Sequence, residues 1–222
     1  MRRSLSTTLP LAVAAAALIA GCGSDSGSDE PPRAVGCMRV AAPRPKSVTS
    51  ERKPRAPLTA GVAWHAVVTT NCGSFTIALD TADQPKTTAS FAALARRGFY
   101  DDLTFHRIAP GFVIQGGDPL GNGTGGPGYE IVERPPRSTR YVHGVVAMAK
   151  TATDTDGTSG SQFFIVTGDD AQLPPQYAVL GRVVDGLDVV DLIDTLPLKE
   201  NDPQGSEPVD PVVIERVAIE RG

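Results

Sequence analysis

Two polar side chains, Arg107 and Gln115, stand on either side of the apolar pair Phe112 and Val113. Arginine is always charged near neutral pH and presents a planar fork of N–H donors. Next to an apolar surface, such a donor stabilises charge that develops on a bound molecule. From these residues alone, Arg107 could equally form a surface salt bridge and Gln115 could be an ordinary polar strand residue.

Other chemical motifs in the chain are incomplete. Residues 121–126 satisfy the pattern G-x-G-x-x-G, but Pro127 and Gly128 follow in place of the helix that binding of a dinucleotide requires. The segment around Ser159 lacks the closing glycine of a nucleophile elbow. The histidines, at positions 65, 106 and 143, do not have zinc-ligand spacing. We therefore expect no cofactor and no metal, and neither a hydrolase nor a metalloenzyme.

Four segments follow one another in a fixed order: residues 105–118, 123–126, 144–149 and 160–165. They read FHRIAPGFVIQGGD, GTGG, GVVAMA and GSQFFI. Together they resemble the signatures of the cyclophilin family, and the likeness covers about residues 62 to 222. The resemblance implies a peptidyl-prolyl cis-trans isomerase. It also implies a mainly β fold, a closed eight-stranded antiparallel barrel capped by two α-helices.

The resemblance also assigns roles to individual residues. Arg107 is expected to hydrogen-bond the substrate proline and polarise its amide nitrogen, and Gln115 to orient the guanidinium. The residues expected to bind substrate are Phe112, Val113, Ala149, Lys150, Gln162, Phe164, Leu173 and Tyr177. Of these, Phe112, Val113, Phe164 and Leu173 are expected to line the proline pocket, although each taken alone fits an ordinary barrel core. The glycines of residues 123–126 would let the backbone pass close to the substrate.

Four positions depart from the pattern common in the family. Val113 stands where many members have Met, and Tyr177 where many have His. Lys150 takes a place commonly held by Asn, which puts the contact to the substrate backbone there in question. Gln172 replaces a Trp that many eukaryotic members carry.

Isomerisation of an X-Pro bond suits this set of residues. The barrier of about 18–20 kcal/mol comes from amide resonance, and no bond is made or cut. A catalyst must hold the proline ring, favour the twisted amide and stabilise the charge that returns to its nitrogen. An apolar pocket beside a fixed cationic donor meets these needs without a nucleophile or a metal.

The elements that would position these residues are short. Pro85 to Arg97 is predicted to be a helix, with Pro in its first turn and Gly98 beyond its end. Gly186 to Leu196 is a second helix, with Val189, Ile193 and Leu196 at helical spacing. Strands are predicted at residues 63–70, 74–79, 111–115, 144–149, 162–167, 178–184 and 212–219. The first two of them are predicted to form a hairpin around Asn71-Cys72-Gly73. Many short strands with two helices favour a closed β barrel.

The first part of the chain has the layout of an export signal. Two arginines precede an uncharged apolar run that is too short to span a bilayer comfortably, and the run closes with Ile19-Ala20-Gly21-Cys22. This ending resembles the lipobox of bacterial lipoproteins, whose cysteine carries diacylglycerol. We expect a signal peptide over 1–21, a lipid on Cys22 and a location on the outer face of the cytoplasmic membrane. An ordinary secretory signal or an uncleaved anchor is the alternative.

Residues 22–61 are predicted to be a basic, Pro-rich and largely disordered linker to the isomerase domain at 62–222. Two cysteines remain after Cys22, namely Cys37 and Cys72. Outside the cytosol they can form one intramolecular disulfide, or they can be two unrelated thiols.

The net charge of −4 does not indicate nucleic acid as a partner. Hydrophobic content of 41% and charged content of 21% suit a globular protein rather than a membrane bundle. The expected partners are proline-containing peptides and unfolded exported proteins, with the membrane reached through the lipid, and the expected state is a monomer. The function predicted is acceleration of X-Pro isomerisation in exported proteins, which assists their folding. The alternative is a chaperone or docking lipoprotein that binds proline peptides with little turnover.

Overall fold

The computed structural model describes residues 36–47, 50–200 and 205–222. The predicted signal peptide at 1–21 and Cys22 lie outside the described residues. The described strands are β1 Trp64–Thr70, β2 Gly73–Leu79, β3 Leu103–Thr104, β4 Arg107–Ala109, β5 Val113–Gly116, β6 Ile131–Val132, β7 Val145–Met148, β8 Thr158–Ser159, β9 Phe163–Val166, β10 Val179–Asp185 and β11 Val213–Arg221. The helices are α1 Pro85–Ala95 and α2 Leu187–Asp194. The mainly β fold with two helices that we predicted is therefore confirmed.

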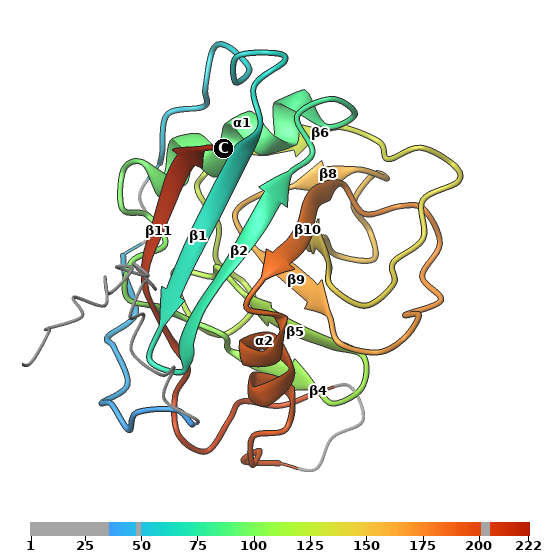
Figure 1. Ribbon diagram of the computed structural model, residues 1–222. Helices are drawn as coiled ribbons and strands as arrows, with labels where there is room; N and C mark the ends of the chain where they lie inside the picture. The colour runs from blue at the N-terminus through green and yellow to red at the C-terminus, as the bar shows by residue number, and fades with distance from the viewer. Residues whose placement is uncertain (1–35, 48–49, 201–204) are drawn as a thin grey trace, which may run out of the picture. The chain divides into compact units, whose positions relative to one another are not determined.

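Nine of these strands form one curled antiparallel sheet in the order β3-β11-β1-β2-β10-β7-β9-β5-β4 (Figure 1). Strands β6 and β8 form a separate small ladder. The two strands at the ends of the large sheet, β3 and β4, are consecutive in the chain and joined only by Phe105 and His106. One interrupted strand thus reaches both edges of the sheet, which accounts for nine strands where eight were expected.

The strands have two differently buried faces because side chains alternate along a strand. Ile108, Ile114, Ile165 and Val146 are successive partners across β4, β5, β9 and β7, and all belong to the main core cluster. Their neighbours along the same strands point to the opposite face. That second face carries the residues considered in the next subsection.

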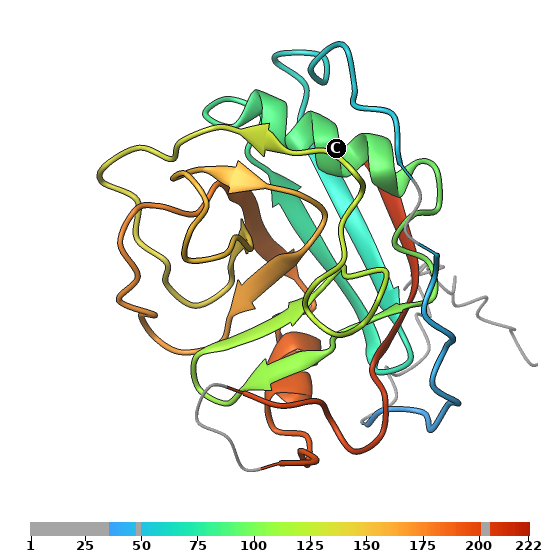
Figure 2. The ribbon, with the colours of Figure 1, turned by 180° about the vertical axis from the view of Figure 1, so that it is seen from behind.

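The helices lie at opposite ends of the curled sheet in both views (Figures 1 and 2). Helix α1 begins at Pro85, whose missing N–H costs nothing in the first turn, and it buries Phe91 and Leu94 in the main core. Helix α2 follows Gly186, which adopts the left-handed region at φ 72°. There a Cβ would overlap the Ser74 carbonyl oxygen, so only glycine fits. The helix buries Val189, Val190 and Ile193.

The described part of the predicted linker, residues 36–47 and 50–61, contains no helix or strand and contacts the domain. This stretch lies along the domain, and Leu58 packs against the main core. The Met38 amide donates to the Asn71 carbonyl at 2.7 Å and the Lys46 amide to the Pro119 carbonyl at 2.8 Å. The Pro-rich composition of this stretch indicates that it forms no regular secondary structure. Hydrogen bonds to the domain hold residues 38 and 46 in place.

Within the described ranges, no helix combines the length and apolar character needed to cross a bilayer.

Candidate functional site

A row of four side chains crosses the second face of the sheet. Arg107, Gln115, Phe164 and Ala147 are successive register partners in the ladders that join β4, β5, β9 and β7. Residues directly opposite one another in a ladder project to the same side of the sheet. The fold therefore places a guanidinium, an amide and an aromatic ring next to one another on one surface.

Hydrogen bonds connect this row to the loop beside it. Arg107 Nη1 donates to Gln115 Oε1 at 3.0 Å, and Gln115 Nε2 donates to Gln162 Oε1 at 3.0 Å. Gln162 Nε2 in turn donates to the carbonyl oxygens of Gly123 and Gly125, each at 2.9 Å. In each glutamine the amide oxygen accepts one hydrogen bond while the amide nitrogen donates another. This series of hydrogen bonds fixes the orientation of both glutamines and of the guanidinium.

An apolar cluster adjoins the row and is separate from the main core. Its buried members are Ala109, Val113, Tyr141, Val145, Ala147, Phe164 and Val166. Phe112, Ala149, Leu173 and Tyr177 are partly buried against it. The structure thus brings together Phe112, Val113, Ala149, Phe164, Leu173 and Tyr177, all predicted to bind substrate, in a cluster beside Arg107. Phe112, Val113, Phe164 and Leu173, which taken alone also fit a barrel core, lie in this cluster and not in the main core cluster.

Three aromatic rings shape one side of this cluster. The rings of Phe164 and Tyr177 meet edge to face with centroids 5.5 Å apart, and those of Tyr141 and Tyr177 are 5.9 Å apart. The Tyr141 hydroxyl donates to the Tyr177 carbonyl at 2.6 Å and accepts from the Tyr177 amide at 2.9 Å. Burial raises the pKa of Tyr141 to about 12, so the hydroxyl stays protonated at physiological pH.

Lys150 lies at the rim of the cluster. Its ammonium is 5.5 Å from the centroid of the Tyr177 ring, within cation–π range. It also donates to the carbonyl oxygens of Thr151 and Asp154, each at 3.2 Å. Two of the positions that depart from the family pattern, Lys150 and Tyr177, are therefore in contact. Gln172, the departure from Trp, is exposed on a backbone with φ 52°.

The glycine-rich loop after β5, residues 121–126, is held by one buried carboxylate. Asp118 Oδ1 accepts from the Leu120 amide at 2.8 Å, and Oδ2 accepts from the amides of Asn122 at 3.0 Å and Gly123 at 2.5 Å. A Cβ on Gly125 would overlap Asp118 Oδ1, so the loop can wrap the carboxylate only because residue 125 is glycine. The chain that follows these glycines, at Pro127 and Gly128, is not helical.

Two hollows flank the hydrogen-bonded side chains of Arg107, Gln115 and Gln162. One, of about 750 Å³, runs between the glycine-rich loop and Ala149–Thr151, with Gln115 and Gln162 in its wall. The other, of about 390 Å³, lies beyond Arg107, and Lys199, Glu200 and Glu207 contribute to its far wall. An extended peptide that crosses these three side chains would enter one hollow on each side of them.

His106 precedes Arg107 and is buried. Burial lowers the pKa of its imidazole below the usual value of 6.5, and the nearby charge of Asp118 acts in the opposite direction. The ring is therefore mainly neutral at pH 7. A neutral His106 does not repel the positive charge of the adjoining Arg107.

The arrangement offers one fixed cation and several aligned amide groups beside an apolar surface. Among the described residues, no group of three or more His, Cys, Asp or Glu is placed to hold a metal. No side chain of the row is a strong nucleophile. The apolar cluster can hold an apolar ring, and Arg107 can place a charged N–H donor next to that ring.

Sequence reasoning missed two supporting residues of the site. Tyr141 holds both peptide groups of Tyr177 from 36 residues away, and no local pattern marks such a contact. Asp118 was part of a quoted segment, but no role was assigned to it. The four glycines at 121, 123, 125 and 126 were a usable signal, because a loop so rich in glycine needs an external hold.

Comparison with known proteins bears on what the site does. The family model described as "cyclophilin type peptidyl-prolyl cis-trans isomerase/CLD" matches residues 65–219. A peptidyl-prolyl cis-trans isomerase-like 2 of Cryptococcus neoformans is 34% identical over 158 residues, which are 70% of this chain but only 27% of that protein. A peptidyl-prolyl cis-trans isomerase of Helicobacter pylori is 39% identical over 132 residues, which are 58% of this chain and 79% of that protein.

A solved structure shares the fold. The crystal structure of a cyclophilin type peptidyl-prolyl cis-trans isomerase of Cryptosporidium parvum, in the presence of the dipeptide Ala-Pro, matches with a TM-score of 0.63. Its sequence is 31% identical, and the match covers 71% of this chain and 99% of that one.

Proposed function

Because the chain belongs to the family of cyclophilin-type peptidyl-prolyl cis-trans isomerases, we propose that it accelerates rotation about X-Pro bonds in exported proteins. The observation that carries this proposal is the hydrogen bond from Arg107 to Gln115 beside the apolar cluster of Val113 and Phe164. The reaction needs a seat for the proline ring and an oriented cationic donor. The apolar cluster provides the seat, and the hydrogen bond orients the donor.

The chemistry follows from the electronic change during rotation. In the planar amide the nitrogen lone pair is shared with the carbonyl, and in the twisted transition state it returns to the nitrogen. A guanidinium N–H placed at that nitrogen stabilises the twisted form more than the planar form, so it accelerates the reaction. Gln115 acts as a positioning residue, because it holds Arg107 Nη1 and so determines where the other donors of the guanidinium point.

The apolar cluster supplies the second requirement. A proline ring that packs against Phe112, Val113 and Leu173 loses contact with water and stays fixed while the preceding carbonyl turns. Gln162 and Ala149 border the hollow between the glycine-rich loop and Ala149–Thr151, where backbone on one side of the proline can lie. Lys150, held by the Tyr177 ring and two carbonyls, contributes a cation to the rim of that hollow.

The activity is tested with a short Ala-Pro peptide in a protease-coupled assay, supported by exchange NMR at equilibrium. We expect the purified chain to accelerate exchange in proportion to enzyme concentration. Binding of the peptide without any acceleration would contradict the proposal and would favour the rival function, a proline-peptide-binding or docking protein.

We further propose that the protein is an exported lipoprotein, held to the outer face of the cytoplasmic membrane through Cys22. The support is the sequence alone, an apolar run that ends in Ile19-Ala20-Gly21-Cys22. Several acyl chains, at about 0.8 kcal/mol per buried methylene, give a firm attachment. Cells fed a clickable fatty acid should label the wild type and not the Cys22→Ala variant, and equal labelling of the two would overturn this assignment.

A further inference from the structure

The glycine-rich loop of the site is contacted at both ends by a segment that precedes the family domain. We call residues 36–47 and 50–58 the N-terminal strap. The Lys46 amide donates to the Pro119 carbonyl at 2.8 Å, and the Glu51 amide donates to the Pro127 carbonyl at 2.7 Å. Lys53 Nζ donates to the Glu130 carbonyl at 2.9 Å, just beyond the second contact. The strap thus reaches the chain on either side of residues 121–126.

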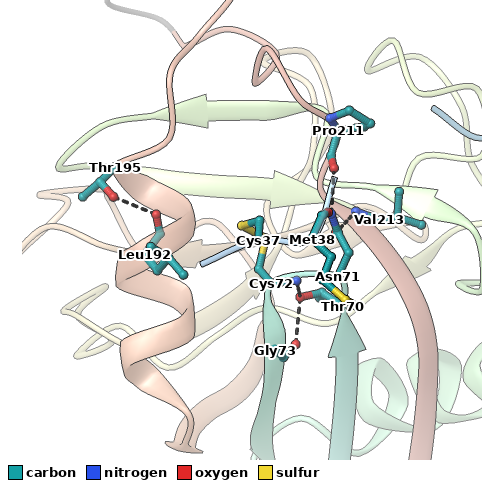
Figure 3. The surroundings of a disulfide bond; sticks show 10 residues. All are labelled: Cys37, Met38, Thr70, Asn71, Cys72, Gly73, Leu192, Thr195, Pro211 and Val213. Carbon is teal, nitrogen blue, oxygen red and sulfur yellow. Dashed lines mark hydrogen bonds between the residues drawn. A yellow bond between two sulfur atoms is a disulfide. The ribbon is translucent and has the colours of Figure 1, made fainter. Parts of the chain in front are cut away.

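The strap is itself fastened to the domain at several points. A disulfide joins Cys37 to Cys72 in the turn between β1 and β2 (Figure 3). Next to it, Asn71 Nδ2 donates to the carbonyls of Met38 and Pro211, and its Oδ1 accepts from the Val213 amide. Asn71 thereby binds the strap and the start of β11 with one side chain.

Two further contacts fasten the strap nearer to the loop. The ammonium of Lys46 donates to the carbonyls of Gly98, Phe99 and Asp101, in the turn that follows α1. Arg97 donates to the Arg52 carbonyl at 2.9 Å and forms an ion pair with Glu51 at 3.5 Å. The donors of Lys46 and Glu51 that reach the loop are therefore fixed relative to α1.

The loop needs such support because of its composition. Residues 121, 123, 125 and 126 are glycines, which have the greatest backbone freedom to lose on ordering. Gly123 and Gly125 present the carbonyls that accept from Gln162, and residues 123–126 line one wall of the hollow of about 750 Å³. The position of the loop therefore determines the width of that hollow and the geometry of the hydrogen bonds that Gln162 donates to the loop.

We propose that the N-terminal strap is a positioning element for substrate binding, which holds the glycine-rich loop at the width that seats the peptide backbone. This inference rests on the proposed isomerase function. Arg107 and Gln115 are placed differently, by the ladder between β4 and β5, which does not involve the strap. Loosening the strap should therefore weaken peptide binding and leave the turnover of bound peptide nearly unchanged.

The test uses the full chain and two changes at one position. Glu51→Pro removes the amide donor to Pro127, whereas Glu51→Ala keeps this donor and removes the carboxylate, which forms the ion pair with Arg97. For an Ala-Pro peptide, we expect Glu51→Pro to raise KM about three- to tenfold, the scale of one lost hydrogen bond, with kcat within about twofold of wild type. Glu51→Ala should stay close to wild type in both constants.

A second variant tests the far end of the strap. Cys37→Ser with Cys72→Ser removes the disulfide, and it should raise KM in the same direction as Glu51→Pro. Circular dichroism establishes that each variant is folded at the assay temperature. A purely structural strap would lower the melting temperature without moving KM.

The amide resonances of Gly123, Gly125 and Gly126 give a readout that does not depend on turnover. In both strap variants these resonances should shift or broaden, while those of β4 and β5 stay in place. Folded variants with wild-type KM and unchanged glycine resonances would overturn the proposal. Displaced glycine resonances in a protein without any isomerase activity would uphold the role of the strap in holding the loop and reject the proposed function alone.

Discussion

Arg107 and Gln115 face each other across the ladder between β4 and β5, and their side chains meet at 3.0 Å. The pairing of the two strands, rather than a flexible loop, therefore determines the direction of the guanidinium. A donor held in advance needs little reorganisation when charge appears on a bound amide.

Arg107→Ala should lower kcat by about 10²–10³, the usual cost of removing one donor that serves the transition state. Affinity for the peptide should fall much less, because the apolar cluster remains. Arg107→Lys should recover little, since an ammonium keeps the charge but loses the planar fork. Exchange NMR gives the rate and circular dichroism the fold. Near-wild-type turnover in a folded Arg107→Ala protein would contradict the mechanism.

Gln115→Met should lower kcat about tenfold or more while keeping a side chain of similar length. The variant removes the acceptor of Arg107 and the donor to Gln162, and hydrogen bonds to charged groups are worth about 1.5–3 kcal/mol. Gln115→Glu restores an acceptor for Arg107 but not the donor to Gln162, so its kcat should lie between that of Gln115→Met and that of wild type. Equal kcat in the two variants would show that the contact with Arg107 does not matter.

Tyr141→Phe should destabilise the domain by about 1–3 kcal/mol, because the amide and carbonyl of Tyr177 lose their partner in a buried place. KM should rise as well, since Tyr177 packs against Phe164 in the apolar cluster. Tyr129→Phe is the matched control, because its hydroxyl contacts Ser90 and is only partly buried. Urea denaturation of the two variants measures the difference, and equal losses would refute this role of Tyr141.

Stability should decline as the pH falls below about 6.5, in part through His106. Burial lowers the pKa of His106 in the folded protein, so the unfolded chain binds the proton first and gains free energy from it. The contribution of His106 to stability is present above its unfolded pKa and is lost as the pH falls through its folded pKa. His106→Asn should show a shallower decline between pH 7 and pH 5 than wild type. Parallel stability curves for the two proteins would count against this account.

The predicted elements agree with the structure where a local pattern was long enough to be read. Pro85 marks the start of α1, and α1 ends at Ala95, two residues before the predicted end at Arg97. Strand β4 was missed, since three residues cannot display a period. Yet β4 carries Arg107, and its pairing with β5 gives Arg107 its partner. The resemblance to the family identified the site residues in the sequence. Only the strand register of the structure shows that Arg107, Gln115 and Phe164 lie on one face of the sheet.

The composition of the strap indicates its lack of regular secondary structure but not its contacts with the domain. Basic and Pro-rich residues do lack an apolar face, so they form neither helix nor strand here. Their order comes from partners outside the segment, such as the carbonyl of Pro119 for the Lys46 amide and Cys72 for Cys37. Such contacts are set by the folded domain, and a segment read by itself does not contain them. The structure joins the two cysteines whose pairing remained open from the sequence.

The short link Phe105-His106 ties β4 to β3, whose pairing partner β11 is the last described strand to be synthesised. Strand β3, which precedes the link, pairs with β11, and β11 follows every other described strand in the chain. A ribosome that has released residues up to about 200 has therefore made Arg107, Gln115 and the whole apolar cluster, but not the strand against which β3 must pair. The polypeptide then carries the strands β4, β5, β9 and β7 that align these groups, but β1 and β3 still lack the strand that lies between them. Because β11 comes last among the described strands, the large sheet is completed only when β11 inserts between β1 and β3.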